Sequence, residues 1–292
     1  MEFTANLMTV DIDPGSWAAR REAEGWDVVA CADHFWSGRR PFPHLWVTLT
    51  AMACATSTVK LTSSFANNLF RSPVEFAQAS LAMQRLSHGR YEAGLGAGWT
   101  EKELLATGQV FPEGRIRARM YREALLIVRE LLTTGQCQFE GEHYTMDVPK
   151  VFTVPADPPP LVASVGGPWT VRNITPIVDR VELKFGRTTR GGQLDLEALA
   201  SVTRDELAGM VEEVRAVRSD IEIGLFVLVS AGDSAEVKTM TDLLGDNLCG
   251  GFTGEPARVL DNLRSLEELG ISRLQVTEMV KGSLDEIAGV LR

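Results

Sequence analysis

The 292-residue sequence lacks the marks of a membrane protein and of a secreted, disulfide-bonded protein. No apolar run approaches the roughly 20 residues that a membrane-spanning helix needs. The first residues, MEFTANLMTVDID, lack the basic region and the apolar run of a signal peptide. The 4 cysteines form no C-x-x-C pair and match no zinc-site spacing. We therefore expect a cytoplasmic protein with reduced thiols, no metal site and no membrane contact.

Basic residues are also in the minority, because 29 Lys and Arg stand against 39 Asp and Glu, which gives a net charge of −10. An acidic surface argues against a nucleic-acid groove as the main function, although it leaves room for a local basic pocket. Internal repeats and low-complexity segments are missing as well. The length suits one large α/β domain or two small ones, and the composition is that of a globular protein.

What the sequence has is an alternation of short apolar segments with longer amphipathic segments. Eight segments predict strands, at residues 3–10, 26–34, 59–65, 89–96, 160–167, 181–186, 222–230 and 272–279. Predicted helices separate most of them, and the clearest lie at 45–55, 116–133, 204–218 and 255–270. This count predicts a (β/α)8 TIM barrel with short insertions, as a single domain over residues 1–292. The alternative is an open, doubly wound sheet.

The functional site of such a barrel forms where the strands end at their carboxyl termini. Asp33 and His34 follow the second predicted strand, and histidine is the side chain that exchanges a proton near neutral pH. The alternative for this pair is a capping Asp33 and a structural His34. The third strand ends in TSSFANN, where Asn67 offers both a donor and an acceptor, or simply forms a polar turn.

Glycines at alternate positions mark the end of the fourth strand, at Gly94, Gly96 and Gly98. The spacing is G-x-G-x-G and not the G-x-G-x-x-G of dinucleotide-binding folds, and the acidic residue downstream, Glu113, does not end a strand. Side chains are missing from one face of such a strand. We therefore expect a flat ligand to lie against the backbone there, with Trp99 as a wall of the pocket.

The end of the fifth strand and a basic segment complete the candidates. Gly166 and Gly167 precede Pro168, which suits the first position of a helix, and amides at a helix start can bind phosphate. A plain glycine turn is the alternative. The segment GRIRARMYR is either a solvated helix start or a contact for an anionic tail, through Arg115, Arg117, Arg119 and Arg122.

Three segments resemble the bacterial-luciferase-like flavin and deazaflavin oxidoreductases: EGWDVVACADHFW, RSPVEFAQASLAMQRLSHGRYEAGLGAGW and FTGEPARVLDNLRSLEELGISRLQV. The resemblance covers most of the chain, and its most specific motif is S-x-G-R-x-x-x-G-L-G-A-G-W. Within this family the sequence looks most similar to the actinobacterial type that uses coenzyme F420, a 5-deazaflavin. FMN is the alternative cofactor, because the same barrel also serves FMN.

The resemblance implies a (β/α)8 barrel with the cofactor ring at its C-terminal mouth, against a non-proline cis peptide bond between Ser64 and Phe65. It implies that His34 is the proton donor or the stabiliser of the anionic ring, and that Asp33 orients His34. The cofactor-binding residues that it implies are Ser64, Phe65, Asn67, Ala97, Gly98, Trp99, Ser164, Val165, Gly166 and Gly167. Glu101 and Glu103 either meet substrate or simply begin a helix, where acidic residues are favourable.

The activity that the resemblance implies is hydride transfer between the deazaflavin C5 and a small organic substrate, by a homodimer. The alternatives are an FMN-dependent monooxygenase and a cofactor-binding barrel without turnover. The sequence departs from relatives that oxidise a sugar phosphate, which have a glutamate in place of Trp99 and a lysine-rich phosphate site. The departure argues against a sugar phosphate and favours a flat or apolar substrate.

Overall fold

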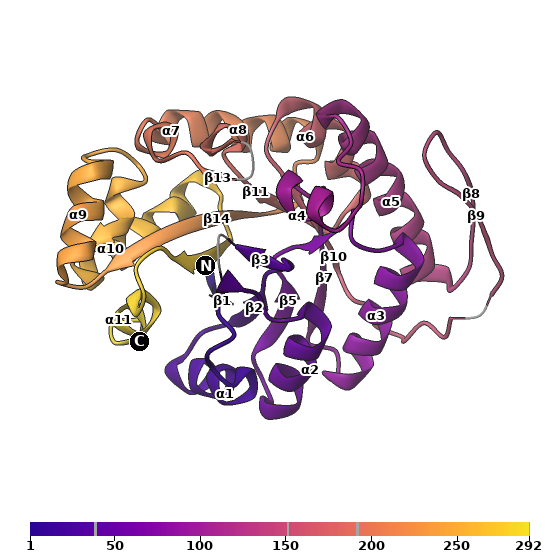
Figure 1. Ribbon diagram of the computed structural model, residues 1–292, viewed down its shortest axis with the longest axis horizontal. Coiled ribbons are helices and arrows are strands. Elements are labelled where there is room, and N and C mark those ends of the chain that lie inside the picture. Colours follow the sequence, from indigo (N-terminus) through magenta and orange to yellow (C-terminus); the bar gives the residue numbers. More distant parts are fainter. Residues whose placement is uncertain (38–39, 151, 191–192, 292) are drawn as a thin grey trace.

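The computed structural model describes residues 1–37, 40–150, 152–190 and 193–291, and its central feature is a closed barrel of parallel strands (Figure 1). The barrel strands are β1 (Glu2–Leu7), β2 (Val28–Cys31), β5 (Lys60–Ser63), β7 (Tyr91–Gly96), β10 (Leu161–Val165), β11 (Arg180–Leu183), β14 (Glu222–Ala231) and β16 (Arg273–Glu278). The ring closes because β16 pairs with β1 and β10 pairs with β7. The predicted TIM barrel is confirmed, and the open sheet is excluded.

Each predicted strand is present, although the barrel strands are mostly shorter than the apolar segments. Residues 26–34 were expected to form one strand, whereas β2 covers Val28–Cys31 and is buried at every position. A parallel strand is covered on both faces, so it reads as a continuous apolar run, and periodicity cannot mark where it ends. In this case Asp33 and His34 lie beyond the strand, at the end where the barrel opens.

Helices surround the barrel, as Figure 1 shows. They are α1 (Pro14–Glu24), α2 (Leu45–Ala55), α3 (Pro73–Leu86), α5 (Gly114–Thr134), α6 (Pro168–Ile174), α8 (Arg204–Val217), α9 (Ala235–Leu244), α10 (Pro256–Arg264) and α11 (Ser283–Ala288). Local sequence explains several boundaries. The Asp13 carboxylate accepts a hydrogen bond from Ser16 N at 2.8 Å at the start of α1. After α10, a 3₁₀ segment (Ser265–Leu269) ends at left-handed Gly270, the stop that the sequence predicted.

Short insertions lie between the barrel elements. After α5, β8 (Cys137–Glu140) and β9 (Thr145–Val148) form an antiparallel hairpin that extends from the side of the molecule (Figure 1). The other insertions are β3 (Trp36–Ser37), β4 (Arg40–Pro41), β6 (Ala66–Asn67), α4 (Glu101–Ala106), β12 (Thr189–Arg190), β13 (Gln193–Leu194), α7 (Leu196–Ala200) and β15 (Thr253–Gly254). Within the described residues, no helix has the length and apolar composition to cross a membrane.

Charged side chains fill the barrel interior at the N-terminal ends of the strands. Glu92 of β7 accepts hydrogen bonds from Arg180 of β11 at 2.7 Å and from Arg273 of β16 at 2.9 Å. We call these three residues the Glu92 cluster. Burial alone would raise the pKa of Glu92, but the two guanidinium groups lower it to about 2. Glu182 joins the cluster through Arg180 Nε at 3.2 Å. This end of the barrel is therefore closed by ion pairs within the protein.

Candidate functional site

A cavity of about 910 Å³ lies at the opposite end, where the barrel strands finish. Barrel enzymes have their active sites at this end. Every residue that the sequence analysis assigned to the catalytic and cofactor-binding site lines the cavity, namely Asp33, His34, Ser64, Phe65, Asn67, Ala97, Gly98, Trp99, Ser164, Val165, Gly166 and Gly167. The fold thus brings together side chains and backbone from the ends of β2, β5, β7 and β10.

His34 is held in place by a carboxylate from α4. Its Nδ1 lies 2.9 Å from Glu103 Oε2, while Glu103 Oε1 accepts hydrogen bonds from Phe35 N at 3.0 Å and Trp36 N at 3.1 Å. Glu103 is fully buried. The Trp99 ring meets the imidazole edge-on, with centroids 5.7 Å apart. Glu103 therefore fixes both the orientation of the ring and the course of the loop that carries it.

Asp33 has other partners. Its carboxylate forms a two-point ion pair with Arg71, in which the Oδ1 contact is 3.1 Å long, and it accepts a hydrogen bond from Asn67 N at 2.7 Å. The expectation that Asp33 orients His34 is therefore corrected, because Glu103 supplies the contacting carboxylate. Asp33 instead fastens the end of β2 to the segment that follows β5.

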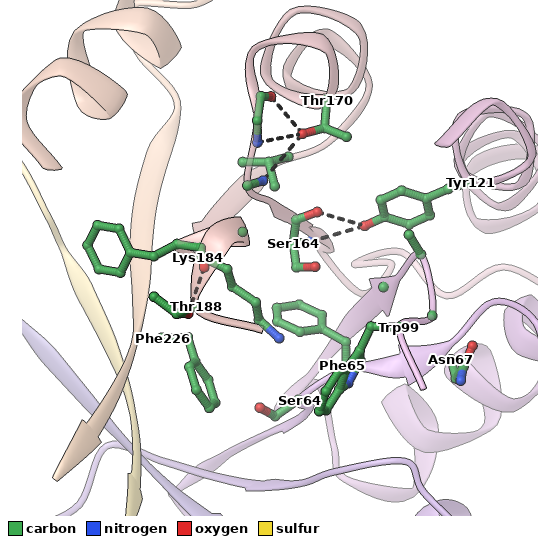
Figure 2. A pocket seen from close by; sticks show the side chains of 18 of the residues that line it. Ser64, Phe65, Asn67, Trp99, Tyr121, Ser164, Thr170, Lys184, Thr188 and Phe226 are labelled. Carbon is green, nitrogen blue, oxygen red and sulfur yellow. Dashed lines mark hydrogen bonds between the residues drawn. The ribbon is translucent and has the colours of Figure 1, made fainter. Parts of the chain in front are cut away.

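The peptide bond between Ser64 and Phe65 is cis, as the resemblance implied. Ser64 Oγ donates to Gln275 Oε1 at 2.7 Å and accepts from Asn6 Nδ2 at 3.2 Å, both inside the barrel. The Phe65 ring faces the cavity, as Figure 2 shows. The segment therefore presents an aromatic face to the cavity from a buried, hydrogen-bonded position.

The alternating glycines of β7 make room for this segment of the protein. A Cβ at Gly94 would lie 2.3 Å from Ser63 O, and one at Gly96 would lie 3.0 Å from Phe65 Cβ. The distance at Gly94 is too short for a real side chain, and the distance at Gly96 is tight enough that Phe65 would have to shift. The expectation that a ligand lies directly against this bare face is thus corrected for Gly94, because Ser63 and Phe65 occupy that space. Gly96 still lines the cavity beside Phe65.

The end of β10 is fixed by hydroxyl groups. Tyr121 Oη donates to Leu95 O at 2.5 Å and accepts from Ser164 N at 3.1 Å, which ties β7 to β10 under the cavity. Thr170 Oγ1 accepts from Gly166 N at 3.3 Å and Gly167 N at 3.2 Å (Figure 2). These amides thus have a partner within the protein, and phosphate binding by them stays a prediction.

The basic segment at the start of α5 lies partly at the cavity. The arginines of the segment that line the cavity are Arg115, Arg117 and Arg119. Arg117 lies over the Phe111 ring at 4.3 Å, and Arg119 forms an exposed ion pair with Glu142 at 3.2 Å. Neither Arg122 nor Glu101 is among the lining residues. Both interpretations of the segment therefore stay open: three of its arginines border the cavity, and contact with an anionic tail stays a prediction.

The cavity also contains a cationic residue, Lys184, that the sequence did not single out. Lys184 directly follows β11, and its Nζ lies 5.0 Å from the ring centroid of Phe65 and 4.8 Å from that of Phe226 (Figure 2). Burial lowers the pKa of Lys184 to about 8, and the charge of Glu182 opposes this shift. A signal was available, because a lysine near the carboxyl end of the apolar segment VELKFG lies where a barrel places functional side chains.

Comparison with known proteins identifies relatives of the chain. The model of the luciferase-like monooxygenase family matches residues 15–240. An F420-dependent glucose-6-phosphate dehydrogenase of Amycolatopsis mediterranei is 34% identical over 72% of this chain and 63% of that enzyme, which is less than two thirds of its length. The enzyme of the same name from Intrasporangium calvum is 28% identical over 88% of this chain and 86% of its own length.

Solved structures share the fold at lower sequence identity. An F420-dependent secondary alcohol dehydrogenase, in complex with an F420-acetone adduct, has a TM-score of 0.77 and 19% identity, over 99% of this chain and 97% of its own. The monooxygenase RslO1 from Streptomyces bottropensis has a TM-score of 0.76 and 15% identity, over 100% of this chain and 97% of its own. These similarities establish the barrel architecture.

Proposed function

Because the chain belongs to the luciferase-like monooxygenase family, we propose that it is an oxidoreductase that uses coenzyme F420. It transfers a hydride between C5 of this deazaflavin and a small organic substrate. The proposal takes residues 1–292 as one barrel domain. Relatives named as F420-dependent dehydrogenases support the deazaflavin over FMN. The observation that carries the proposal is that the expected cofactor-binding residues, from separate strand ends, surround one cavity together with His34.

The cavity fits a tricyclic ring with a polar chain. Its volume of about 910 Å³ falls within the ~300–1,000 Å³ of typical small-molecule sites. Gly114 and Gly167 line it, and a Cβ at either position would meet no atom within 4 Å, so the backbone is open to a ligand there. In this proposal Phe65 contacts the ring, while Ala97 and Gly98 hold the polar chain together with the β10 end, Ser164, Val165, Gly166 and Gly167. When bound, F420 supplies the hydride donor or acceptor at C5.

His34 handles the proton that accompanies the hydride, or stabilises the anionic form of the ring. Its Nδ1 is engaged by Glu103, and the hydrogen bond at one imidazole nitrogen sets the protonation of the other. Nε2 is therefore the atom that exchanges a proton with a ligand in the cavity. Asp33 contributes indirectly, because its bond to Asn67 N holds the cavity wall.

The substrate in this proposal is a small, flat or apolar molecule. The indole of Trp99 and the ring of Phe42, whose centroid is 5.2 Å from that of His34, surround the imidazole with aromatic surface. A sugar phosphate would place hydroxyl groups against that surface. We further propose that the protein acts as a homodimer in the cytoplasm, and light scattering of the purified protein tests the dimer.

Titration of the purified protein with F420 and, separately, with FMN tests the cofactor. The absorbance and fluorescence of each cofactor report binding. We expect saturable binding of F420 and much weaker binding of FMN. Binding of FMN alone would instead favour the FMN-dependent monooxygenase, for which oxygen consumption is the next measurement, and binding of neither would refute the cofactor assignment.

Replacement of His34 tests the role of the histidine. In His34→Ala we expect turnover to fall by about 10²–10⁴-fold, the usual contribution of general acid–base catalysis, with little change in F420 affinity. Turnover is followed through the deazaflavin absorbance with a panel of alcohols, ketones and glucose 6-phosphate. His44→Ala is the matched control, because His44 precedes α2 and forms no side-chain capping bond. Unchanged turnover in His34→Ala would contradict the role of His34.

A further inference from the structure

The proposed function assigns no role to Lys184, a cationic side chain in the cavity. Among the described residues, its ammonium group forms no hydrogen bond and no ion pair, and the contacts recorded for it are the rings of Phe65 and Phe226. An ammonium group has three donors. Water can serve these donors in an open cavity, but a ligand that fills the cavity displaces that water and must replace its hydrogen bonds.

The carboxylates of the protein do not fill this need. Glu182 is two residues away on β11, and its Oε1 binds Arg180 at 3.2 Å. Its Oε2 is buried without a hydrogen-bond partner among the described residues, and neither oxygen forms a hydrogen bond or an ion pair with Lys184. The other carboxylates at this end are also engaged, because Asp33 binds Arg71 and Glu103 binds His34. A ligand that displaces water from Lys184 therefore has to supply the acceptor itself.

We propose that Lys184 binds a carboxylate group of the substrate, so that the substrate class is small organic acids with a flat or apolar body. This inference rests on the proposed function and adds the substrate class to it. The flanking rings favour a flat group, because Phe65 and Phe226 lie within about 5 Å of the ammonium. A carboxylate carries the single negative charge that matches one ammonium between two apolar rings.

The location of Lys184 favours the substrate over the cofactor as the source of the carboxylate. Lys184 follows β11 and faces Phe226 of β14 (Figure 2). The residues expected to hold the cofactor come from β5, β7 and β10 and from the segments that follow them. The Lys184 side chain lies over the Phe65 ring, and Lys184 N donates to Val165 O at 2.9 Å, so the two sites adjoin at the end of β10. The ammonium lies between the rings of Phe65 and Phe226, on the side of the cavity formed by β11 and β14.

The lowered pKa of Lys184 is consistent with this role. Burial disfavours the charged ammonium, and a bound carboxylate would offset that cost by pairing with the charge. The Lys184 ammonium would in turn discriminate against the neutral analogue of the substrate, because the neutral molecule leaves the ammonium without a charged partner. Lys184 is therefore a specificity-determining residue in this proposal.

Calorimetric titration of the F420-loaded protein tests the proposal. The ligands are benzoate and cinnamate, each paired with its uncharged amide, benzamide or cinnamamide. The proteins are the wild type, Lys184→Met, which keeps the length of the side chain, and Lys238→Met, a control at an exposed lysine of α9. In the wild type we expect the acids to bind at least about tenfold more tightly than the amides, as for a charge-assisted hydrogen bond. This preference should disappear in Lys184→Met and persist in Lys238→Met.

Several outcomes would overturn the proposal. Acids and amides that bind equally well to the wild type, or that both fail to bind, would refute it, as would a preference for acids that survives in Lys184→Met. A loss of F420 affinity in Lys184→Met, with the preference for acids intact, would assign the cation to the cofactor. Lys184→Gln replaces the methionine variant if that variant does not fold. If the wild type does not bind F420, the proposed function fails, and titration of the F420-free protein still tests Lys184.

Discussion

Charged side chains lie inside both ends of the barrel, but among the described residues Glu92 at the N-terminal end is paired within the protein and Lys184 at the C-terminal end is not. At the N-terminal end, the carboxylate of Glu92 accepts hydrogen bonds from Arg180 and Arg273 within 3.0 Å. At the C-terminal end, the Lys184 ammonium faces the rings of Phe65 and Phe226. The pKa values reflect the difference, since pairing lowers the pKa of Glu92 to about 2, against the effect of burial, and burial lowers that of Lys184 to about 8.

The paired charges stabilise the fold, whereas the unpaired charge is the one that we propose to bind a ligand. A paired buried charge has its partner within the protein. Removal of one member therefore leaves the other as an uncompensated charge in the low-dielectric interior. An unpaired buried charge lowers stability, and a bound partner can offset this cost. His34 falls between these cases, because Nδ1 is bound by Glu103 while the imidazole lines the cavity.

The largest expected effect is at the paired end. Glu92→Gln removes the charge that Arg180 and Arg273 share, and we expect the free energy of unfolding to fall by about 3–5 kcal/mol, as when one partner of a buried ion pair is lost. Denaturant titration measures this change. The control is Glu222→Gln, because the Glu222 carboxylate lies 3.9 Å from Arg180 and its side chain is 65% exposed, which predicts a loss below about 1 kcal/mol. Equal losses in both variants would contradict the comparison.

The next largest effect concerns the histidine. Glu103→Gln keeps the size of the side chain but weakens its hold on His34 Nδ1, and we expect kcat to fall by about tenfold to hundredfold with little change in KM, within the range of acid–base catalysis. A role confined to stability would lower the amount of folded enzyme and leave kcat per folded molecule unchanged. Glu101→Gln, at an exposed position in the first turn of α4, is the control.

At the unpaired end the expected change has the opposite sign. Lys184→Met removes a desolvated charge, so we expect the Tm at pH 7 to rise by about 2–5 °C. The folded protein has a Lys184 pKa of about 8, against an ordinary value of 10.5. Between these values the unfolded chain binds more protons, so wild-type stability should rise with pH in this window. Melting curves at pH 7 and above pH 9 should show this rise in the wild type alone, and a lower Tm in the variant at pH 7 would refute the assignment.

The smallest effect is expected at an exposed ion pair on the rim of the cavity. Arg119 and Glu142 form an ion pair at 3.2 Å, but both side chains are more than half exposed, at 58% and 59%. Glu142→Gln should therefore change the free energy of unfolding by less than about 0.5 kcal/mol, since exposed pairs contribute little. A loss comparable with that of Glu92→Gln would show that burial does not determine how much an ion pair contributes to the free energy of unfolding.

The fold could be predicted from the sequence because barrel strands have a local signature. Segments such as VVAC are buried on both faces and remain apolar throughout, and the helices between them begin at capping residues such as Asp13. The C-terminal ends of the strands then followed from the barrel rule, and the assigned residues do line one cavity. The chemical roles of those residues remain predictions.

The sequence was misleading where the meaning of a residue depends on a distant neighbour. The bare face of Gly94 was interpreted as space for a ligand, whereas Ser63 and Phe65 from the adjacent strand end occupy it. Asp33 precedes His34 in the chain, and the two were interpreted as a pair, although the histidine is bound by Glu103, 69 residues away. Spacing along the chain carries no information about such contacts.

The sequence by itself determined the alternation of strands and helices, and with it the end of the barrel at which the cavity forms. Both depend on hydrophobic periodicity and on capping residues, which act over a few neighbouring positions. Only the tertiary structure decided which charges found partners. Arg180 begins β11 and Lys184 directly follows it, yet Arg180 meets Glu92 and Lys184 meets two phenylalanine rings. Closure of the barrel sets these distances, and the electrostatic energy of a charge depends on its neighbours in space.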